Sequence, residues 1–367
     1  MTGFIASACR SPVAPRGGAL SALALHELAA PVINAALREA GLTPQDVDEV
    51  ILSNALGGGG NPARIAALAA GLPEQVAGLS TDRQCAGGLD AILLAAMMVQ
   101  SGHADVVVAG GAESYSRRPL RHQTFADGRA SEPYDQAPFT PWPDRDPDMA
   151  VAAAALARSH GISKQAQDDW AVASHAKALA RPARSSEVIS IAGLQSDSFA
   201  RALSPALCMR AKVISGDITA ANAAVAADGA AFCVVVSQKV AARLTSPLVR
   251  VIGGATRGGT PECPGLAPVA AIQTSLARHG LSAAEINTAE IMEAYAVQAI
   301  ACVQGAGLDP AQVNRGGGAL ARGHPIGASG AINAVRLYHE LIQSGGGTGL
   351  AAIAAAGGLG TALLLGT

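Results

Sequence analysis

Two stretches about half a chain apart follow the same plan, and this repetition limits the folds open to the chain. In each stretch a helix-like apolar run stops at a Ser-Gly pair, 101–102 and 344–345. A strand of small apolar residues follows and ends in Gly110-Gly111 or Gly357-Gly358. A repeat of this size excludes a solenoid of short units. Helices alternate with strands throughout, as is typical of layered α/β domains with a mostly parallel sheet. The sequence therefore predicts two similar α/β halves that face each other.

A stretch of different composition interrupts the first half. From Tyr115 to Asp148 the chain carries six prolines, five arginines and five of its eleven aromatic residues. This is too long for a passive loop in a compact domain. We interpret it as the start of an insertion that covers a site, and a solvated insertion without function is the alternative. The predicted organisation is an N-terminal half at 1–114 plus 227–244, an inserted loop domain at 115–226 and a C-terminal half at 245–367.

The net charge and the cysteine spacing narrow the functions open to the chain. A formal net charge of −2 gives no basic surface for nucleic acid or an anionic membrane. No window is apolar and long enough to span a bilayer, and the N-terminus lacks the basic region of a signal peptide. The six cysteines lie far apart without a Cys-x-x-Cys pair, which argues against zinc and against disulfides. We expect a cytoplasmic protein with no bound metal, no nucleic-acid partner and no membrane partner.

Cys85 is the first candidate for chemistry. It precedes Gly87-Gly88 and an apolar run that predicts a buried helix up to Ser101. At a helix N-terminus the free backbone N–H groups and the helix dipole favour a thiolate. The glycines leave room for a substrate near the sulfur. An activated nucleophile is one interpretation, and a small buried core cysteine is the other.

His324 is its counterpart in the second half. Residues 323–331 read Gly-His-Pro-Ile-Gly-Ala-Ser-Gly-Ala and precede a predicted helix that extends to Leu341. If the two halves face each other, Cys85 lies on one facing helix and the His324 loop on its partner.

These segments resemble the thiolase family, and the similarity extends nearly from end to end. It is carried by Cys85-x-Gly-Gly-Leu with Val108–Ser114, by Gly317–Gly330 around the histidine, and by Thr219–Asn222 with Asp228–Ala231. The resemblance implies a five-layered α/β/α/β/α fold with an inserted loop domain, a homodimer or homotetramer, and acyl-CoA thioesters as substrates with no bound cofactor. In thioester exchange a Cys85 thiolate attacks the acyl carbonyl, and His324 takes the thiol proton and later returns it. Backbone N–H groups at the Gly357-Gly358 turn can stabilise the oxyanion.

The chain departs from the thiolase pattern at three positions. Ala354 stands where thiolases that form or cleave carbon–carbon bonds have a second cysteine as acid/base. Met292 begins the segment Met-Glu-Ala-Tyr, where the family has an Asn-Glu-Ala-Phe-like motif whose Asn or His holds a water or carbonyl oxygen. Ala224 replaces a serine expected near the pantetheine. The first two losses weaken the Claisen half-reaction, and the third weakens substrate positioning.

Two further residues are expected to bind substrate. Met149 lies at the start of a predicted helix, and Arg210 lies in an irregular, cationic stretch at 181–217. Arg210 can bind a phosphate group of the substrate. The alternative is that it lies on a solvent-exposed face without such a role.

Two hypotheses follow from the sequence. In the first, the protein is an acyltransferase that acts on acyl-CoA through an acyl-Cys85 intermediate, with His324 as base and an impaired Claisen step. In the second, it is a degenerate thiolase that binds acyl-CoA or serves as a partner subunit.

Overall fold

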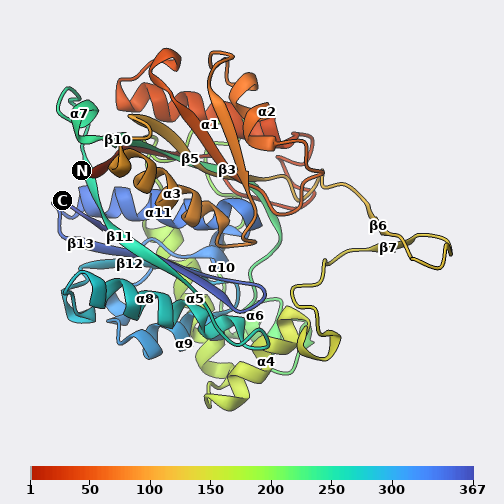
Figure 1. Cartoon of the computed structure of the whole chain (residues 1–367). Helices are drawn as coiled ribbons and strands as arrows, with labels where there is room; N and C mark the ends of the chain where they lie inside the picture. Colours follow the sequence, from red (N-terminus) through yellow and green to blue (C-terminus); the bar gives the residue numbers. More distant parts are fainter. Residues whose placement is uncertain (1) are drawn as a thin grey trace.

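The computed structural model describes residues 2–367 and has five layers, in which helices alternate with two halves of one sheet (Figure 1). The strand order is β12-β13-β14-β11-β1-β10-β5-β3-β4, and β2 pairs with β10. A short pairing between β1 and β11, at Phe4 with Arg250 and Ile5 with Val249, joins the halves. The strands are β1 (Gly3–Arg10), β2 (Ala14–Pro15), β3 (Glu49–Ser53), β4 (Ala77–Thr81), β5 (Val106–Glu113), β10 (Ala227–Ser237), β11 (Val249–Gly258), β12 (Thr288–Ile291), β13 (Thr348–Ala355) and β14 (Leu359–Gly366).

Helices cover both outer faces and fill the middle. The first outer layer is α1 (Leu25–Ala40) and α2 (Pro62–Ala69), and the second is α8 (Ala267–Arg278) and α9 (Ala296–Ala306). Between the sheet halves lie α3 (Gly87–Ser101) and α11 (Ile326–Gln343). Helix α11 is buried from Gly327 to Leu341, because a helix in the central layer has neighbours on every side. The central layer therefore brings the N-termini of α3 and α11 together. The predicted five-layered α/β arrangement is present.

The expectation of a mostly parallel sheet is wrong. Among the strands of this sheet within residues 2–367, only β3–β4, β3–β5 and β12–β13 pair in parallel, and the remaining strand pairs are antiparallel. Two features of the chain explain this. The Gly357-Gly358 turn, with φ of 75° at both residues, makes a hairpin of β13 and β14. Strand β10 returns from the inserted region to lie between β1 and β5, and it runs opposite to both.

Helix α1 begins earlier than the sequence indicated. We expected its regular part to start at Pro31, yet the helix begins at Leu25 and continues through the proline. The start is stabilised by the Glu27 carboxylate, which accepts from the backbone N–H of Ala24 at 2.7 Å. Leu28 is fully buried in the first turns. Packing and capping thus outweigh the loss of one backbone donor at Pro31.

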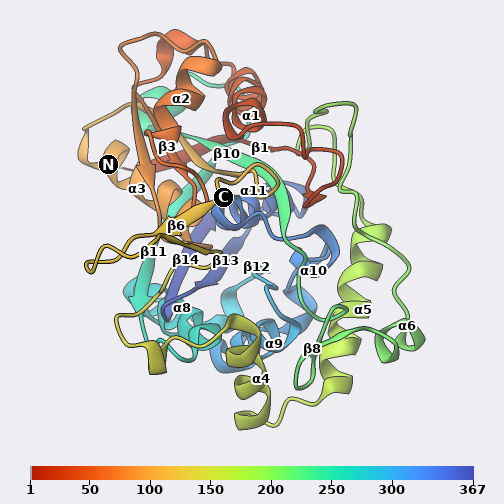
Figure 2. The same cartoon turned by 90° about the vertical axis from the view of Figure 1, so that its right-hand side faces the viewer.

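The inserted region, 115–226, begins with a hairpin that projects from the body (Figure 1). The hairpin consists of β6 (Arg121–Gln123) and β7 (Glu132–Tyr134). It is followed by α4 (Met149–Ser159), α5 (Lys164–Ala180), α6 (Pro205–Met209), β8 (Val213–Ser215) and β9 (Ile218–Thr219). Figure 2 shows α4 and α5 beside α9 and α10 (Ala319–Arg322). The remaining short elements are α7 (Gln238–Ala241), η1 (Pro44–Asp46), η2 (Pro143–Arg145), η3 (Pro264–Leu266), η4 (Ala283–Glu285) and η5 (Pro310–Gln312). The domain boundaries at 114/115, 226/227 and 244/245 stay a prediction.

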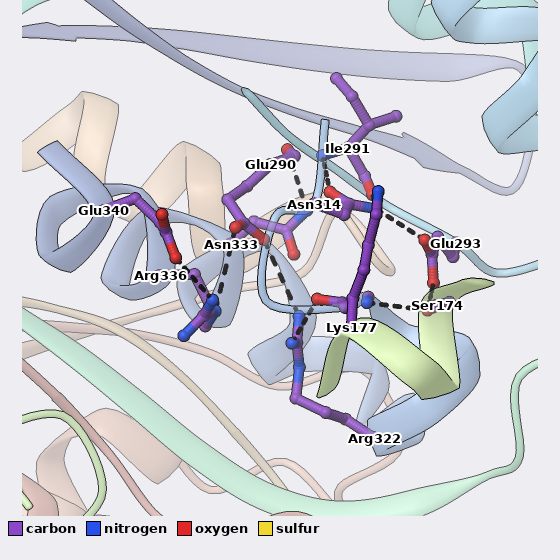
Figure 3. Close-up of polar contacts among 12 residues, drawn as sticks. Ser174, Lys177, Glu290, Ile291, Glu293, Asn314, Arg322, Asn333, Arg336 and Glu340 are labelled. Atoms are coloured by element: carbon purple, nitrogen blue, oxygen red, sulfur yellow. Dashed lines mark hydrogen bonds and ion pairs between the residues drawn. The ribbon is translucent and has the colours of Figure 1, made fainter. Parts of the chain in front are cut away.

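Buried ion pairs dock the inserted region onto the two halves. Glu187 accepts from Arg10 Nε of β1 and from Arg336 Nη1 of α11, each at 2.8 Å. The two arginines hold the pKa of the buried Glu187 carboxyl at about 2, against the upward effect of its burial. Arg336 also donates to Glu340 at 3.1 Å, and Figure 3 shows this pair on α11. The Glu187 carboxylate of the inserted region thus binds both strand β1 and helix α11.

Candidate active site

Cys85 lies two residues before α3, at the end of a tight turn. Its neighbour Gln84 has φ of 49°, which is the left-handed region that non-glycine residues rarely adopt. The turn is closed by backbone bonds from Ala86 to Arg83 at 3.1 Å and from Gly87 to Gln84 at 3.2 Å. Cys85 is partly buried and borders a large cavity.

His324 lies between α10 and α11, and its imidazole faces Cys85. The distance from Cys85 Sγ to His324 Nε2 is 3.2 Å. The histidine backbone is held by the chain that returns from the inserted region, because its N–H donates to Val225 O at 2.8 Å and it forms a bridge with Ala226. The two predicted chemical residues, 239 positions apart in the sequence, therefore meet in the fold.

Glycines allow α3, α11 and β5 to approach closely enough for this contact. A Cβ at Gly88 of α3 would lie 2.8 Å from the backbone N of Ala331 on α11. A Cβ at Gly111 of β5 would lie 2.0 Å from the carbonyl oxygen of Gly327. Side chains at these positions would separate the helices, so the glycines set the distance between Cys85 and His324.

Ser329 fixes which nitrogen of His324 carries the proton. The Ser329 hydroxyl donates to Pro325 O at 3.0 Å, and a carbonyl can only accept. The same Oγ lies 2.7 Å from His324 Nδ1 and therefore accepts from an Nδ1–H. Nε2 is left with a lone pair that points at the Cys85 thiol. This is the tautomer that a base toward Cys85 requires.

Burial keeps both members of the pair neutral. Burial raises the pKa of the Cys85 thiol to about 12. A hydrogen bond from the backbone N–H of Cys85 lowers this pKa, but by less. Burial lowers the pKa of His324 to about 4. Desolvation of the sulfur acts against the resting thiolate that we expected at the helix N-terminus, and it is the larger of the two effects on the pKa.

A buried carboxylate anchors the start of α11 near the pair. Glu113, at the end of β5, accepts from the backbone N–H of Gly327 at 2.9 Å and from Asn54 Nδ2 at 2.6 Å. It also accepts from the N–H groups of Ala55 and Leu56. Burial raises the pKa of Glu113 to about 7 despite these four donors. Glu113 thus connects the β3–α2 loop with the first turn of α11.

The cavity beside Cys85 has a volume of about 700 Å³ and is shared by all three regions of the chain. Three of the other predicted site residues line it: Met149, Ala224 and Ala354. Four do not, within the lining that residues 2–367 provide: Met292, Gly357, Gly358 and Arg210. Met292 is 1% exposed and packs in the central core. Arg210 is exposed and ends α6.

The Gly357-Gly358 turn lies behind the cavity wall. A Cβ at Gly357 would lie 3.1 Å from Phe139 O, and one at Gly358 would lie 2.7 Å from Thr260 O. Both residues have φ of 75°, so the positions favour glycine for conformation as well as space. The wall itself is formed by Ala354, Ala355 and Ala356 just before the turn.

Comparison with known proteins identifies the family. The family model "Thiolase, N-terminal domain" matches residues 3–239, and "Thiolase, C-terminal domain" matches residues 245–367. The chain belongs to the thiolase family. Acetyl-CoA acetyltransferase of Cupriavidus necator is 37% identical over 391 residues, covering 98% of each chain.

Two solved thiolase structures show the same fold. The acetyl-CoA acetyltransferase of Bacillus anthracis has a TM-score of 0.91 at 34% identity, covering 100% of this chain and 98% of that one. The Acat5 thiolase of Ascaris suum, in complex with coenzyme A, has a TM-score of 0.90 at 29% identity with full coverage of both chains. The predicted thiolase fold is thus confirmed.

A buried polar network lies close in the chain to the histidine segment, and Figure 3 shows its members Glu293, Ser174 and Asn314. Glu293 follows Met292 and accepts from Ser174 Oγ at 2.7 Å, from Asn314 Nδ2 at 2.7 Å and from the N–H of Leu320 at 3.2 Å. It therefore connects α5, the turn at 314 and α10, which leads directly to His324. The carboxylate is fully satisfied, and it holds the segment that carries Tyr295 against the one that carries the histidine.

Sequence reasoning missed several residues that the structure places at the site. Ser329 lies in the histidine motif, five positions after His324. Its polar side chain about one helical turn from the histidine was the only feature of the sequence that pointed to it. Tyr295 and Gln298 line the cavity from the start of α9. Their spacing of three on a predicted helix could have placed them on one face, but not toward the cavity. Within residues 2–367 no group of three or more His, Cys, Asp or Glu side chains is arranged to hold a metal, and no helix could cross a membrane.

Proposed function

We propose that this thiolase transfers acyl groups from acyl-CoA thioesters through an acyl-Cys85 intermediate, with His324 as base. The observation that carries the proposal is the 3.2 Å contact between Cys85 Sγ and a lone pair of His324 Nε2 at the wall of a 700 Å³ cavity. An acyltransferase is also what the family assignment and the named activities of the relatives support. The complex of the Ascaris suum thiolase with coenzyme A supports the same class of ligand here.

The first half-reaction balances without any group beyond these two. Because both are neutral at rest, the thiol proton moves to Nε2 as the sulfur attacks the thioester carbonyl. A tetrahedral intermediate forms, and its oxyanion develops beside Cys85 at the start of α3, where the helix dipole favours negative charge. Collapse breaks the bond between the carbonyl carbon and the coenzyme A sulfur. The proton on Nε2 passes to that sulfur, which leaves acyl-Cys85 and free coenzyme A.

The carbon–carbon half-reaction lacks its usual base. Ala354 lines the cavity with a methyl group that transfers no proton, and Met292 turns its side chain into the core. A general base contributes about 10²- to 10⁴-fold to a proton transfer. We therefore infer that acyl-Cys85 passes its acyl group more readily to a heteroatom nucleophile deprotonated by His324 than to a carbanion.

The proposal is tested by intact-protein mass spectrometry after mixing with acetyl-CoA and a panel of longer acyl-CoAs. The expected result is one acyl adduct and one equivalent of free coenzyme A, both lost in Cys85→Ala. Cys263→Ala is the matched control, because Cys263 is the other partly exposed cysteine in the described chain.

Absence of both an adduct and coenzyme A release with every thioester would refute the acyltransferase mechanism. Binding of acyl-CoA without release would then favour the degenerate, binding-only alternative.

A further inference from the structure

The first turn of α9 carries a buried amide, Gln298, at the lining of the cavity. Gln298 is 3% exposed, and its Nε2 has no hydrogen-bond partner in residues 2–367. The other end of the amide is fixed, since Oε1 accepts from the backbone N–H of Ala294 at 3.2 Å. With Oε1 used in this way, the NH₂ group is the end that remains for the cavity that Gln298 lines. A buried amide donor without a partner is costly, which is why such groups are rare outside ligand sites.

Tyr295 adds a second donor on the same wall, three residues earlier. Its backbone pairs with Ala223, and Ala224 N–H donates to Ala294 O at 2.9 Å. The same extended segment pairs with His324 through Ala226, so one short stretch of chain places Tyr295 beside the catalytic pair. Burial and the nearby Asp148 carboxylate raise the pKa of Tyr295. The hydroxyl is therefore protonated at neutral pH and can donate a hydrogen bond.

The wall around these donors is apolar and built from small residues. Ala152, Ala153 and Leu156 of α4 line the cavity opposite α9. Gly265 closes the gap between them, because a Cβ there would lie 2.8 Å from Leu156 Cδ2 and 3.4 Å from Gln298 Cγ. The cavity also carries polar groups elsewhere, among them Asn54, Gln84 and Arg121, so Tyr295 and Gln298 are the donors at its α9 end. A few convergent polar groups of this kind fix the orientation of a ligand and give it specificity.

We propose that Tyr295 and Gln298 form a hydrogen-bonding subsite for an uncharged oxygen in the outer part of the acyl chain, so that the enzyme prefers oxo- or hydroxyacyl thioesters to alkyl ones. This rests on the proposed acyl transfer to Cys85. An uncharged oxygen is favoured over a carboxylate because both donors are neutral and the carboxylate of Asp148 lies near Tyr295. A plain alkyl chain would bury both donors without a partner, and sites of this kind discriminate strongly against such chains.

The test compares rates of Cys85 acylation, measured by quenched-flow mass spectrometry, for matched thioesters. Pentanoyl-CoA is paired with 4-oxopentanoyl-CoA, and hexanoyl-CoA with 5-oxohexanoyl-CoA, so that two oxygen positions are sampled. Succinyl-CoA has nearly the shape of the 4-oxopentanoyl thioester but ends in a carboxylate. We expect the oxo thioester of at least one pair to react at least about tenfold faster than its alkyl partner and than succinyl-CoA.

The variants separate the donors from a structural role. Gln298→Met and Tyr295→Phe should each reduce the oxo-to-alkyl ratio several-fold, and the double variant should bring the ratio near one. Gln298→Glu keeps an oxygen that can accept from Ala294 but has no NH₂, so it should also lose the preference. Gln304→Met makes the same exchange at an exposed position of α9 and should change nothing.

Three outcomes would overturn the subsite. They are equal rates within both pairs, a faster reaction with succinyl-CoA, and variants that slow oxo and alkyl thioesters alike. In each of these Cys85 still becomes acylated, so only the subsite fails. Failure of every thioester to label Cys85 would instead remove the proposed acyl transfer, and the subsite with it.

Discussion

Gly111→Ala tests whether the close approach of β5 to α11 sets the catalytic distance. The added methyl would lie 2.0 Å from Gly327 O, 2.8 Å from Gly327 C and 3.1 Å from Ala328 Cα. All three are backbone atoms of the first turn of α11, so no side-chain rotation can relieve the clash. Side-chain Cβ atoms do not approach closer than 3.0 Å. The turn, three residues after His324, must therefore move by about 1 Å, the shortfall in that distance.

The magnitude follows from this displacement. Overpacking of this kind costs about 1–3 kcal/mol, and the fixed backbone on both sides places Gly111→Ala near the upper end. Thermal unfolding should show a Tm lower by several degrees. A 1 Å misplacement of a reacting group costs about 10²-fold in rate, so we expect Cys85 acylation to slow by about that factor while some fold is retained.

The assay is single-turnover acylation by acetyl-CoA, followed by mass spectrometry alongside thermal unfolding. Gly258→Ala is the matched control: it also lies in a strand, and its Cβ would meet only Leu359 Cδ2 at 4.0 Å. A Gly111→Ala protein with the acylation rate and Tm of the parent would refute the idea that this contact positions His324.

Four further predictions address the chemistry of the site. Ser329→Ala should slow acylation about tenfold, because His324 loses the partner of its Nδ1–H, and unchanged kinetics would show that the tautomer is set elsewhere. The acylation rate should be flat from pH 5 to 8, since the pKa of His324 is lowered from 6.5 to about 4 and its base form persists above that value; a fall centred near pH 6.5 would contradict this. Protonation of the same histidine should lower the free energy of unfolding as the pH falls from 6.5 toward 4, because the unfolded chain binds the proton more tightly than the folded one. Urea unfolding at several pH values checks the direction of this change. Ala354→Cys should raise exchange of the acyl α-protons with D₂O by about 10²-fold, measured by mass spectrometry, and no gain would show that the missing thiol is not what limits carbanion formation.

The sequence was sufficient to predict which residues meet at the site. Cys85 and His324 each stand in a glycine-rich motif before a helix, and the duplicated plan of the chain implied that these helices face each other. Both inferences depend on local patterns and on topology. The structure brings the pair to 3.2 Å. The fold class could be predicted for the same reason, because the alternation of helices and strands is local information.

Properties that depend on tertiary packing could not be predicted from local sequence patterns. The pKa of Cys85 is raised by desolvation, which no motif reveals and which acts against the expectation from the helix dipole. The strand directions depended on which strands became neighbours, and the antiparallel position of β10 follows from a return across the inserted region. The orientation of Gln298 is set by its bond to Ala294 and could be seen only once the start of α9 had been placed.

The three expected departures from the thiolase pattern each place an apolar side chain where a polar one was expected. Ala354 and Ala224 line the cavity with methyl groups, and Met292 packs in the core, at positions where the sequence resemblance led us to expect polar residues. An apolar surrounding raises the cost of any charge that develops on the substrate α-carbon, because its enolate would lack both a base and a polar neighbour. In the proposed mechanism the tetrahedral intermediate of acyl transfer is affected less, since its charge develops beside Cys85 at the N-terminus of α3, where the helix dipole favours negative charge. We infer that the burial of Cys85 and His324 favours thioester exchange over carbon–carbon bond chemistry.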